Sequence, residues 1–246
     1  MTKILTIISD CLDENAKARQ EIRYSSFVPN ITTKFIGTID DIGANGNLID
    51  AIDAYQGTPG IIVANVAPRG SKEKYPNGIP FCFHQFGELL IVGTPNCFEL
   101  ACKLGLFSKT NETDVLTVCS KYLSKEEAQR IAESQFRSYE YLPLLVKWIL
   151  ESKKIEAKEI SITPFSKESV VWHIDNFGNC KTTARELSEL SKFSKIRFFE
   201  RLTDVPEDGE PAIIRGSSGY KGRFLELVVK RGSASRKLSL GLGSVV

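Results

Sequence analysis

The chain of 246 residues is long enough for one large domain or two modest ones, and either can bury a full hydrophobic core. Its 42% hydrophobic and 25% charged residues are typical of a soluble globular protein. A net charge of +2 with scattered basic residues excludes a general attraction to nucleic acid or membrane, so neither is an expected partner. No apolar run approaches the roughly 20 residues that span a bilayer, and the first residues lack a signal-peptide pattern. We therefore expect a cytoplasmic protein.

The first part of the chain alternates between strand and helix patterns. Strands are predicted at residues 3–8, 33–36 and 60–66, and a hairpin at 81–86 and 88–92 around Gly87. Helices are predicted at residues 13–28, 46–55, 98–104, 124–134 and 142–152, the fourth with a capping box formed by Ser124 and Glu127. This alternation predicts an α/β domain over residues 1–152 with a central, mostly parallel sheet.

After the charged residues 151–154 the pattern changes to short strands separated by turns. Strands are predicted at residues 160–162, 170–174, 195–199, 212–215 and 224–229, and only residues 183–190 have a helical pattern. We expect a small all-β C-terminal domain over residues 160–246, with a linker at 153–159.

The cysteines and histidines do not favour a metal site. The six cysteines form no C-x-x-C pair, and the only two histidines are His84 and His173. No metal is therefore expected, and the cysteines are interpreted as reduced, mostly buried thiols. His84 lies among phenylalanines on a predicted hairpin strand and is interpreted as structural.

The segment at residues 172–183 places a carboxylate, an aromatic ring and a carboxamide close together around Gly178. Asp175 could face an ammonium group, Phe177 a flat ring, and Asn179 the hydrogen-bonding edge of a ring. A hairpin turn in which Asp175 and Asn179 only cap backbone groups explains this segment alone equally well.

Polar residues also follow three predicted strands of the first domain, at Asp10, residues 66–69 and residues 94–96. Because open α/β sheets bind ligands beyond the carboxyl ends of their strands, we expect a ligand site at this edge. No Walker or G-x-G-x-x-G spacing is present, so phosphate binding is not supported. The polar stretch at residues 69–78 predicts an exposed loop or lid.

Over nearly the whole chain, these segments resemble the S-adenosylmethionine hydroxide adenosyltransferase family, to which the fluorinase and chlorinase enzymes are related. Residues 174–179, followed by Thr182 and Thr183, are similar to the family's I-D-x-F-G-N-x-x-T-N. Residues 216–220, 225–229 and 231–234 are similar to its last strands, and residues 6–10 and 91–96 to its opening strand and its V-G-P-D-N.

The resemblance implies a seven-stranded α/β domain followed by a small C-terminal barrel. It also implies a homotrimer whose sites lie at the subunit interface, between the N-terminal domain of one subunit and the C-terminal domain of the next. S-adenosylmethionine would be a small-molecule substrate, with no separate cofactor. Asp10 would hold the ribose hydroxyls and Asp175 the methionine ammonium, with Arg231 near the methionine carboxylate. The adenosyl part would contact Phe177, Asn179 and Tyr220, and Phe136 is a further predicted substrate-binding residue.

The chain departs from the hydrolytic members of this family, which use an Asp, an Arg and a His. The stretch that holds the Asp, V-D-P-G-V-G, reads Ile-Val-Ala-Asn-Val-Ala at residues 62–67, so an apolar residue or an amide replaces it. Arg137 stands in the place of the His, and a guanidinium cannot act as a base near neutral pH. Arg69 lies near the place of the family's Arg. Arg69 and Ser138 are therefore our candidate catalytic residues, for placing the nucleophile.

The predicted function is an S-adenosylmethionine hydrolase that gives adenosine and L-methionine. Two alternatives stay open. The protein could bind an adenosyl compound or another nucleoside without catalysis. It could also be an S-adenosylmethionine-dependent halogenase, because the segment at residues 136–138 resembles the halogenase version, in which a serine contacts halide.

Overall fold

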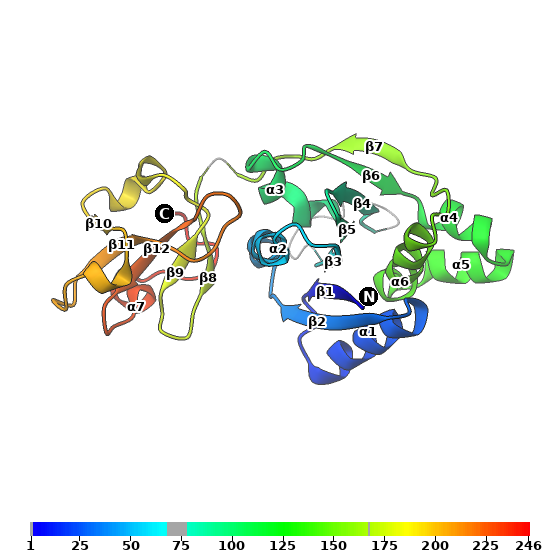
Figure 1. Ribbon diagram of the computed structural model, residues 1–246, viewed down its shortest axis with the longest axis horizontal. Coiled ribbons are helices and arrows are strands. Elements are labelled where there is room, and N and C mark those ends of the chain that lie inside the picture. The colour runs from blue at the N-terminus through cyan, green and yellow to red at the C-terminus, as the bar shows by residue number, and fades with distance from the viewer. Residues whose placement is uncertain (1, 68–77, 167) are drawn as a thin grey trace. The chain divides into compact units, whose positions relative to one another are not determined.

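The structure is a computed structural model that describes residues 2–67, 78–166 and 168–246, and it divides into two compact units (Figure 1). The first unit is Met1–Phe165 and the second is Ser166–Val246. The division falls later than the linker predicted at residues 153–159, because β7 (Lys158–Ser161) pairs with β6 (Lys109–Thr113) of the first unit. The strand predicted at residues 160–162 therefore belongs to the α/β unit and does not open the second.

The first unit is built on a seven-stranded sheet with the order β2-β1-β3-β5-β4-β6-β7. Its other strands are β1 (Lys3–Ser9), β2 (Ile31–Gly37), β3 (Gly60–Asn65), β4 (Phe81–Phe86) and β5 (Leu89–Gly93). The pairs joining β2, β1, β3 and β5 are parallel, whereas those joining β5, β4, β6 and β7 are antiparallel. The sheet is thus mixed and not mostly parallel, because the β4–β5 hairpin reverses the chain direction.

Helices cover both faces of this sheet (Figure 1). One face carries α2 (Asp41–Tyr55), the 3-10 helix η1 (Pro95–Phe98) and α3 (Glu99–Lys103). The other carries α1 (Glu14–Phe27), α4 (Val115–Tyr122), α5 (Lys125–Glu133) and α6 (Arg137–Leu150). Several of these helices begin where the sequence provides an N-cap. The side chains of Asp13, Asp114 and Ser124 each accept a hydrogen bond from the backbone N–H of the residue three positions later. The helix predicted to begin at residue 142 begins at Arg137 instead.

The core of the first unit lies between the strands and the helices α1 and α4–α6. Leu5, Ile7 and Val63 are at most 1% exposed and pack in one cluster with Tyr141 and Trp148 of α6. On the opposite face, Tyr55 at the end of α2 donates its hydroxyl to the carbonyls of Ile4 and Ile61, both at 3.1 Å. The β1 and β3 backbones are therefore held from both sides, and this fixes the loops that follow them.

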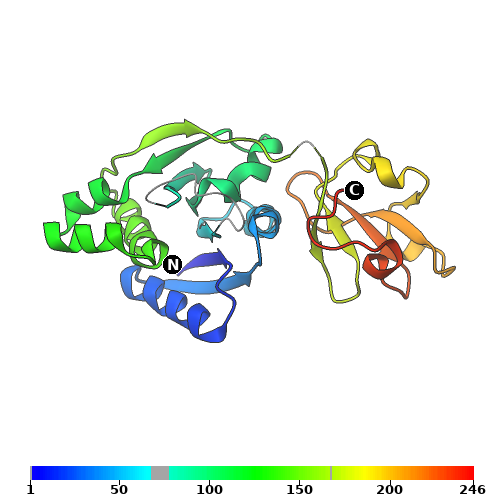
Figure 2. The same ribbon diagram turned by 180° about the vertical axis from the view of Figure 1, so that it is seen from behind.

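The second unit contains a five-stranded sheet with the order β10-β11-β12-β9-β8. Its strands are β8 (Val171–Ile174), β9 (Cys180–Thr182), β10 (Arg197–Phe199), β11 (Pro211–Arg215) and β12 (Leu225–Val229). The unit also contains the short helix α7 (Ala234–Leu238) and the 3-10 helices η2 (Leu187–Glu189), η3 (Ser191–Phe193) and η4 (Leu202–Asp204). From behind, α7 is seen close to β11 and β12 (Figure 2). The β-rich character is confirmed, the helix at residues 183–190 shrinks to η2, and the barrel stays a prediction.

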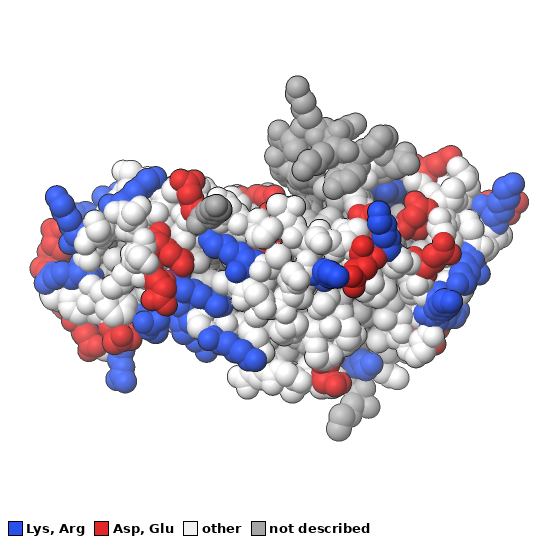
Figure 3. All heavy atoms as spheres, turned by 90° about the horizontal axis from the view of Figure 1, so that it is seen from above, with Lys and Arg blue, Asp and Glu red and all other residues white. Residues whose placement is uncertain are grey.

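Charges of both signs are interspersed on the surface of the second unit in Figure 3, without separation into a basic and an acidic area. Within the described ranges, no helix combines the length and the apolar character that crossing a bilayer requires.

Candidate functional site

A groove of about 690 Å³ lies in the first unit, beyond the carboxyl ends of β1, β3 and β5. We call it the N-terminal groove. The side chains that line it include Asp10, Asn65, Asn96, Glu99, Phe136, Arg137 and Ser138. The groove therefore brings together the predicted residues Asp10, Phe136 and Ser138. Arg69 lies outside the described residues.

Asp10 follows β1 directly and is held by the neighbouring loop. Its Oδ2 accepts a hydrogen bond from the N–H of Ala67 at 3.3 Å, and its Oδ1 lies 4.0 Å from the Sγ of Cys11. Ser9 supports the same turn, because its Oγ accepts from the N–H of Cys11 at 3.2 Å. A carboxylate has about four lone-pair sites, so more than one hydrogen-bond donor can share that of Asp10.

The loop after β5 is anchored by Asn45, which is 1% exposed on α2. Its Nδ2 donates to the carbonyl of Asn96 at 2.7 Å, and its Oδ1 accepts from the N–H of Leu100 at 2.8 Å. Asn96 donates through Nδ2 to the carbonyl of Val66 at 3.4 Å, and its Oδ1 is buried without a partner among the described residues. Sequence reasoning placed residues 94–96 at the edge of the site but did not select Asn96. The position of Asn96 just after a predicted strand was the feature that could have identified it.

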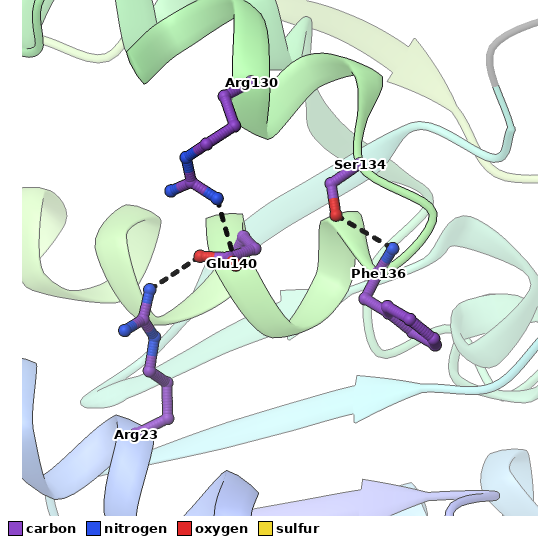
Figure 4. Close-up of polar contacts among 5 residues, drawn as sticks. All are labelled: Arg23, Arg130, Ser134, Phe136 and Glu140. Atoms are coloured by element: carbon purple, nitrogen blue, oxygen red, sulfur yellow. Dashed lines mark hydrogen bonds and ion pairs between the residues drawn. The ribbon is translucent and has the colours of Figure 1, made fainter.

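The start of α6 forms another wall of the N-terminal groove. Phe136 is 66% exposed at the helix start, and its N–H donates to the Oγ of Ser134 at 3.1 Å (Figure 4). Arg137 is half-buried; its Nη2 donates to the carbonyl of Ile79 at 3.1 Å, and its guanidinium lies 5.5 Å from the ring centre of Phe81. Burial lowers the pKa of Arg137, and the charge of Asp114 opposes this in part. Arg137 is therefore committed to structure and does not replace the family's base.

Glu140 ties the first turn of α6 to two other helices (Figure 4). Its carboxylate lies 2.7 Å from Nη2 of Arg23 on α1 and 3.3 Å from Nη1 of Arg130 on α5. Arg137, in the same turn, donates instead to the carbonyl of Ile79.

The second unit carries a groove of about 810 Å³, which we call the C-terminal groove. Its lining includes the predicted residues Asp175, Phe177, Asn179 and Arg231, together with Leu202, Lys230, Ser233 and Arg236. Tyr220 is not among its lining residues. The carbonyl of Tyr220 instead accepts from Nη2 of Arg185 at 2.8 Å, in the loop between β11 and β12.

Asp175 organises the turn between β8 and β9. Its Oδ1 accepts from the N–H groups of Phe177 and Asn179, both at 2.9 Å, and its Oδ2 accepts from Nδ2 of Asn179 at 2.9 Å. Burial acts to raise the pKa of Asp175, but these hydrogen bonds and the nearby His173 outweigh it and lower the pKa. The capping interpretation of the turn is thus confirmed, and the ligand role must be compatible with it.

The turn presents Phe177 because Gly178 packs closely on the start of α7. Gly178 has φ 81°, and a Cβ there would lie 2.1 Å from the Oγ of Ser233. Its carbonyl accepts from the N–H of Ser235 at 2.9 Å. Phe177 beside it is 78% exposed, which is unusual for a phenylalanine and leaves its ring available to a ligand.

The described residues contain no group of three or more His, Cys, Asp or Glu side chains arranged to hold a metal ion. All six cysteines are free thiols. Burial raises the pKa of Cys82, Cys97 and Cys119 to about 12, so these three are inert structural thiols.

Comparison with known proteins bears on the second unit directly. Residues 169–246 match the family model described as the SAM hydroxide adenosyltransferase C-terminal domain. The C-terminal unit therefore matches the C-terminal domain of the SAM hydroxide adenosyltransferase family. The resemblance inferred from the turn at Asp175–Asn179 is therefore confirmed, and the C-terminal groove lies wholly within the matched residues.

Solved structures extend the likeness to the whole fold. An uncharacterized conserved protein from Thermotoga maritima has a TM-score of 0.67 at 14% identity, with 97% of each chain covered. A conserved hypothetical protein from Thermus thermophilus has a TM-score of 0.60 at 20% identity, covering 99% of this chain and 97% of its own. No functionally curated protein matches the chain. At these identities the two structures show that the fold is shared, but they do not show an activity.

Proposed function

We propose that the protein binds S-adenosylmethionine and hydrolyses it at C5′ to adenosine and L-methionine. The observation that carries the proposal is the C-terminal groove, in which Asp175, Phe177 and Arg231 lie together within the matched family domain. A carboxylate, an exposed aromatic ring and a guanidinium suit an ammonium, a flat base and a carboxylate, respectively. S-adenosylmethionine carries all three groups.

The reaction needs little covalent chemistry from the protein. The oxygen of water forms a bond to C5′ while the C5′–S bond breaks, and the electron pair of that bond goes to sulfur. The sulfonium becomes the neutral thioether of methionine, and the water gives up a proton to solvent. Because the leaving group is already activated, the protein has mainly to hold the sulfonium, exclude bulk water and align one water opposite sulfur.

The N-terminal groove suits the other half of this task. Asp10 would accept hydrogen bonds from the ribose hydroxyls. Ser138 lies in the first turn of α6 and lines the groove, where its hydroxyl oxygen would accept a hydrogen bond from the attacking water and hold that water in position. Arg69 is proposed as the second nucleophile-placing residue.

A binding protein without catalysis is the second candidate. Its supporting observation is that Arg137 replaces the family's His and is tied to Ile79, while the family's Asp is an apolar residue or an amide at residues 63–65. A halogenase is a third and weaker candidate, and it depends on Ser138 contacting halide.

Incubation with S-adenosylmethionine, followed by chromatography, tests these candidates. We expect equimolar adenosine and methionine, with oxygen from ¹⁸O-labelled water in the 5′-hydroxyl. Asp10→Asn should abolish turnover, whereas Glu14→Gln on α1, where the carboxylate is 90% exposed, pairs with Lys17 and lines neither groove, should not. No product together with a thermal shift by adenosine would favour the binding protein. Product formed only with added chloride or fluoride would favour the halogenase.

We also propose a cytoplasmic homotrimer, in which the N-terminal groove of one subunit and the C-terminal groove of a neighbour share one ligand. Free, high-pKa cysteines suit a reducing compartment. Sharing between subunits suits two grooves that each carry only part of the predicted contacts.

A further inference from the structure

An acidic loop lies beside the cations of the C-terminal groove. An oxygen of Glu207, Oε2, lies 3.2 Å from Nη1 of Arg231, and its Oε1 lies 3.9 Å from Nζ of Lys230. Both cations line the groove. The side chain of Glu207 is 46% exposed and that of Arg231 is 79% exposed, so solvent and ligands can reach the pair.

The loop that carries Glu207 is anchored on both sides. Two residues earlier, Val205 is 1% exposed and packs with Ala212 and Val228. On the other side, Asp208 lies 2.6 Å from Nη2 of Arg197. An exposed ion pair normally contributes little because two long side chains must be ordered. Here the fold holds the loop in place, so the carboxylate is kept near Arg231.

Arg231 is held by an uncommon backbone conformation. Its φ is 59°, in the left-handed region that residues with a Cβ rarely adopt. The next residue, Gly232, closes the turn by donating its N–H to the carbonyl of Val229 at 2.9 Å. Such local strain is characteristic of ligand clamps, and here it sets the guanidinium beside both the groove and Glu207.

We propose that Glu207 is a specificity-determining residue that occupies the place of a ligand carboxylate at Arg231. The planar guanidinium pairs best with one carboxylate at a time, so a ligand carboxylate must displace Glu207. A ligand without that carboxylate leaves the pair intact. Glu207 therefore weakens the binding of the methionyl end relative to the adenosyl end, and it favours release of methionine after displacement. That this ligand is S-adenosylmethionine rests on the proposed function. The displacement of Glu207 from Arg231 by a carboxylate does not.

The test uses Glu207→Gln, which removes the charge and keeps the shape. Glu200→Gln is the matched control, because it makes the same chemical change at a carboxylate that pairs with Arg215, and neither residue lines the groove. Binding of S-adenosylmethionine and of its decarboxylated analogue to the full chain is measured by calorimetry. We expect E207Q to tighten the binding of S-adenosylmethionine about threefold and to leave the binding of the analogue unchanged, while E200Q changes neither. Equal effects of E207Q on the two ligands, or none, would overturn the inference.

If the unaltered protein binds neither ligand, the proposed function fails and the exchange is decided with acetate. The Nε–Hε resonance of Arg231 is followed by NMR during an acetate titration. We expect E207Q to reach the half-point of its shift at about one third of the acetate concentration that the unaltered protein needs. Equal half-points in both proteins would refute the role of Glu207.

Discussion

Asp175 has a structural task in the turn and a proposed task as the partner of an ammonium group, and both use the same carboxylate. Three hydrogen bonds from Phe177 and Asn179 hold its two oxygens in the turn. About four lone-pair sites are available on a carboxylate, so one direction remains for an ammonium group. The turn therefore holds the negative charge of Asp175 in a fixed orientation at the C-terminal groove. A substitution that removes only the charge should have a different effect on ligand binding from one that also breaks the turn.

Asp175→Asn is predicted to separate these two tasks. Its side-chain oxygen can still accept from the backbone N–H groups, but the negative charge is lost. We expect S-adenosylmethionine to bind about tenfold more weakly or worse, with adenosine binding unchanged, as measured by calorimetry. Asp175→Ala should weaken both, because the turn that presents Phe177 loses its bonds. Equal losses for both ligands in Asp175→Asn would refute the ammonium role.

His84 gives a prediction for the pH dependence of stability. It is half-buried, with its ring stacked on Phe107 at a centroid distance of 4.2 Å. Burial lowers its pKa, and a backbone hydrogen bond at Lys109 opposes this only in part. The folded pKa lies below the unfolded value, so the stabilisation is fully present above about pH 6.5 and is lost as the pH falls below that value through the folded pKa. Urea unfolding should show this loss as the pH is lowered from about 7 to 5, and His84→Phe should show less of it. The same slope in both proteins would exclude His84 as its source.

At the level of elements, the sequence predicted well the features that nearby residues determine, but it did not predict which strands pair with each other. The β4–β5 hairpin and the helix starts at Asp13 and Ser124 follow from turn and cap residues, which act within a few positions. The start of α6 was missed because Phe136 provides no side-chain cap and Pro143 lies inside the helix. The strand β7 was assigned to the wrong unit because a short apolar run does not specify its partner strand.

The position of α6 depends on Glu140, which gives a stability prediction. Its side chain is 18% exposed, and it neutralises Arg23 and Arg130 from two neighbouring helices. Glu140→Gln should lower the free energy of unfolding by about 1–3 kcal/mol, because Arg23 is left partly buried without its carboxylate. Glu159→Gln is the control: that carboxylate is 62% exposed beside Lys109 and should cost less than about 1 kcal/mol. Urea denaturation measures both, and equal costs would contradict the anchoring role.

At the scale of the whole molecule, the predicted site is divided between two grooves in two units. In the C-terminal groove, sequence reasoning selected Asp175, Phe177 and Asn179 because they lie within one turn, and it also selected Arg231. Asn96 in the N-terminal groove was not selected, because its place there depends on Asn45 of α2, which is far from it in the sequence. Contacts between distant segments carry no local pattern in the sequence.

Mixing two inactive variants tests whether the grooves of different subunits share a ligand. Asp10→Asn impairs only the N-terminal groove, and Asp175→Asn impairs only the C-terminal groove. In a homotrimer with shared sites, a site is intact when an Asp175→Asn subunit supplies its N-terminal groove and an Asp10→Asn subunit supplies its C-terminal groove. Random co-assembly should therefore restore about one quarter of the adenosine formation, whereas each variant alone stays inactive. A site formed within one subunit would give no recovery at any mixing ratio, because every subunit then carries one impaired groove.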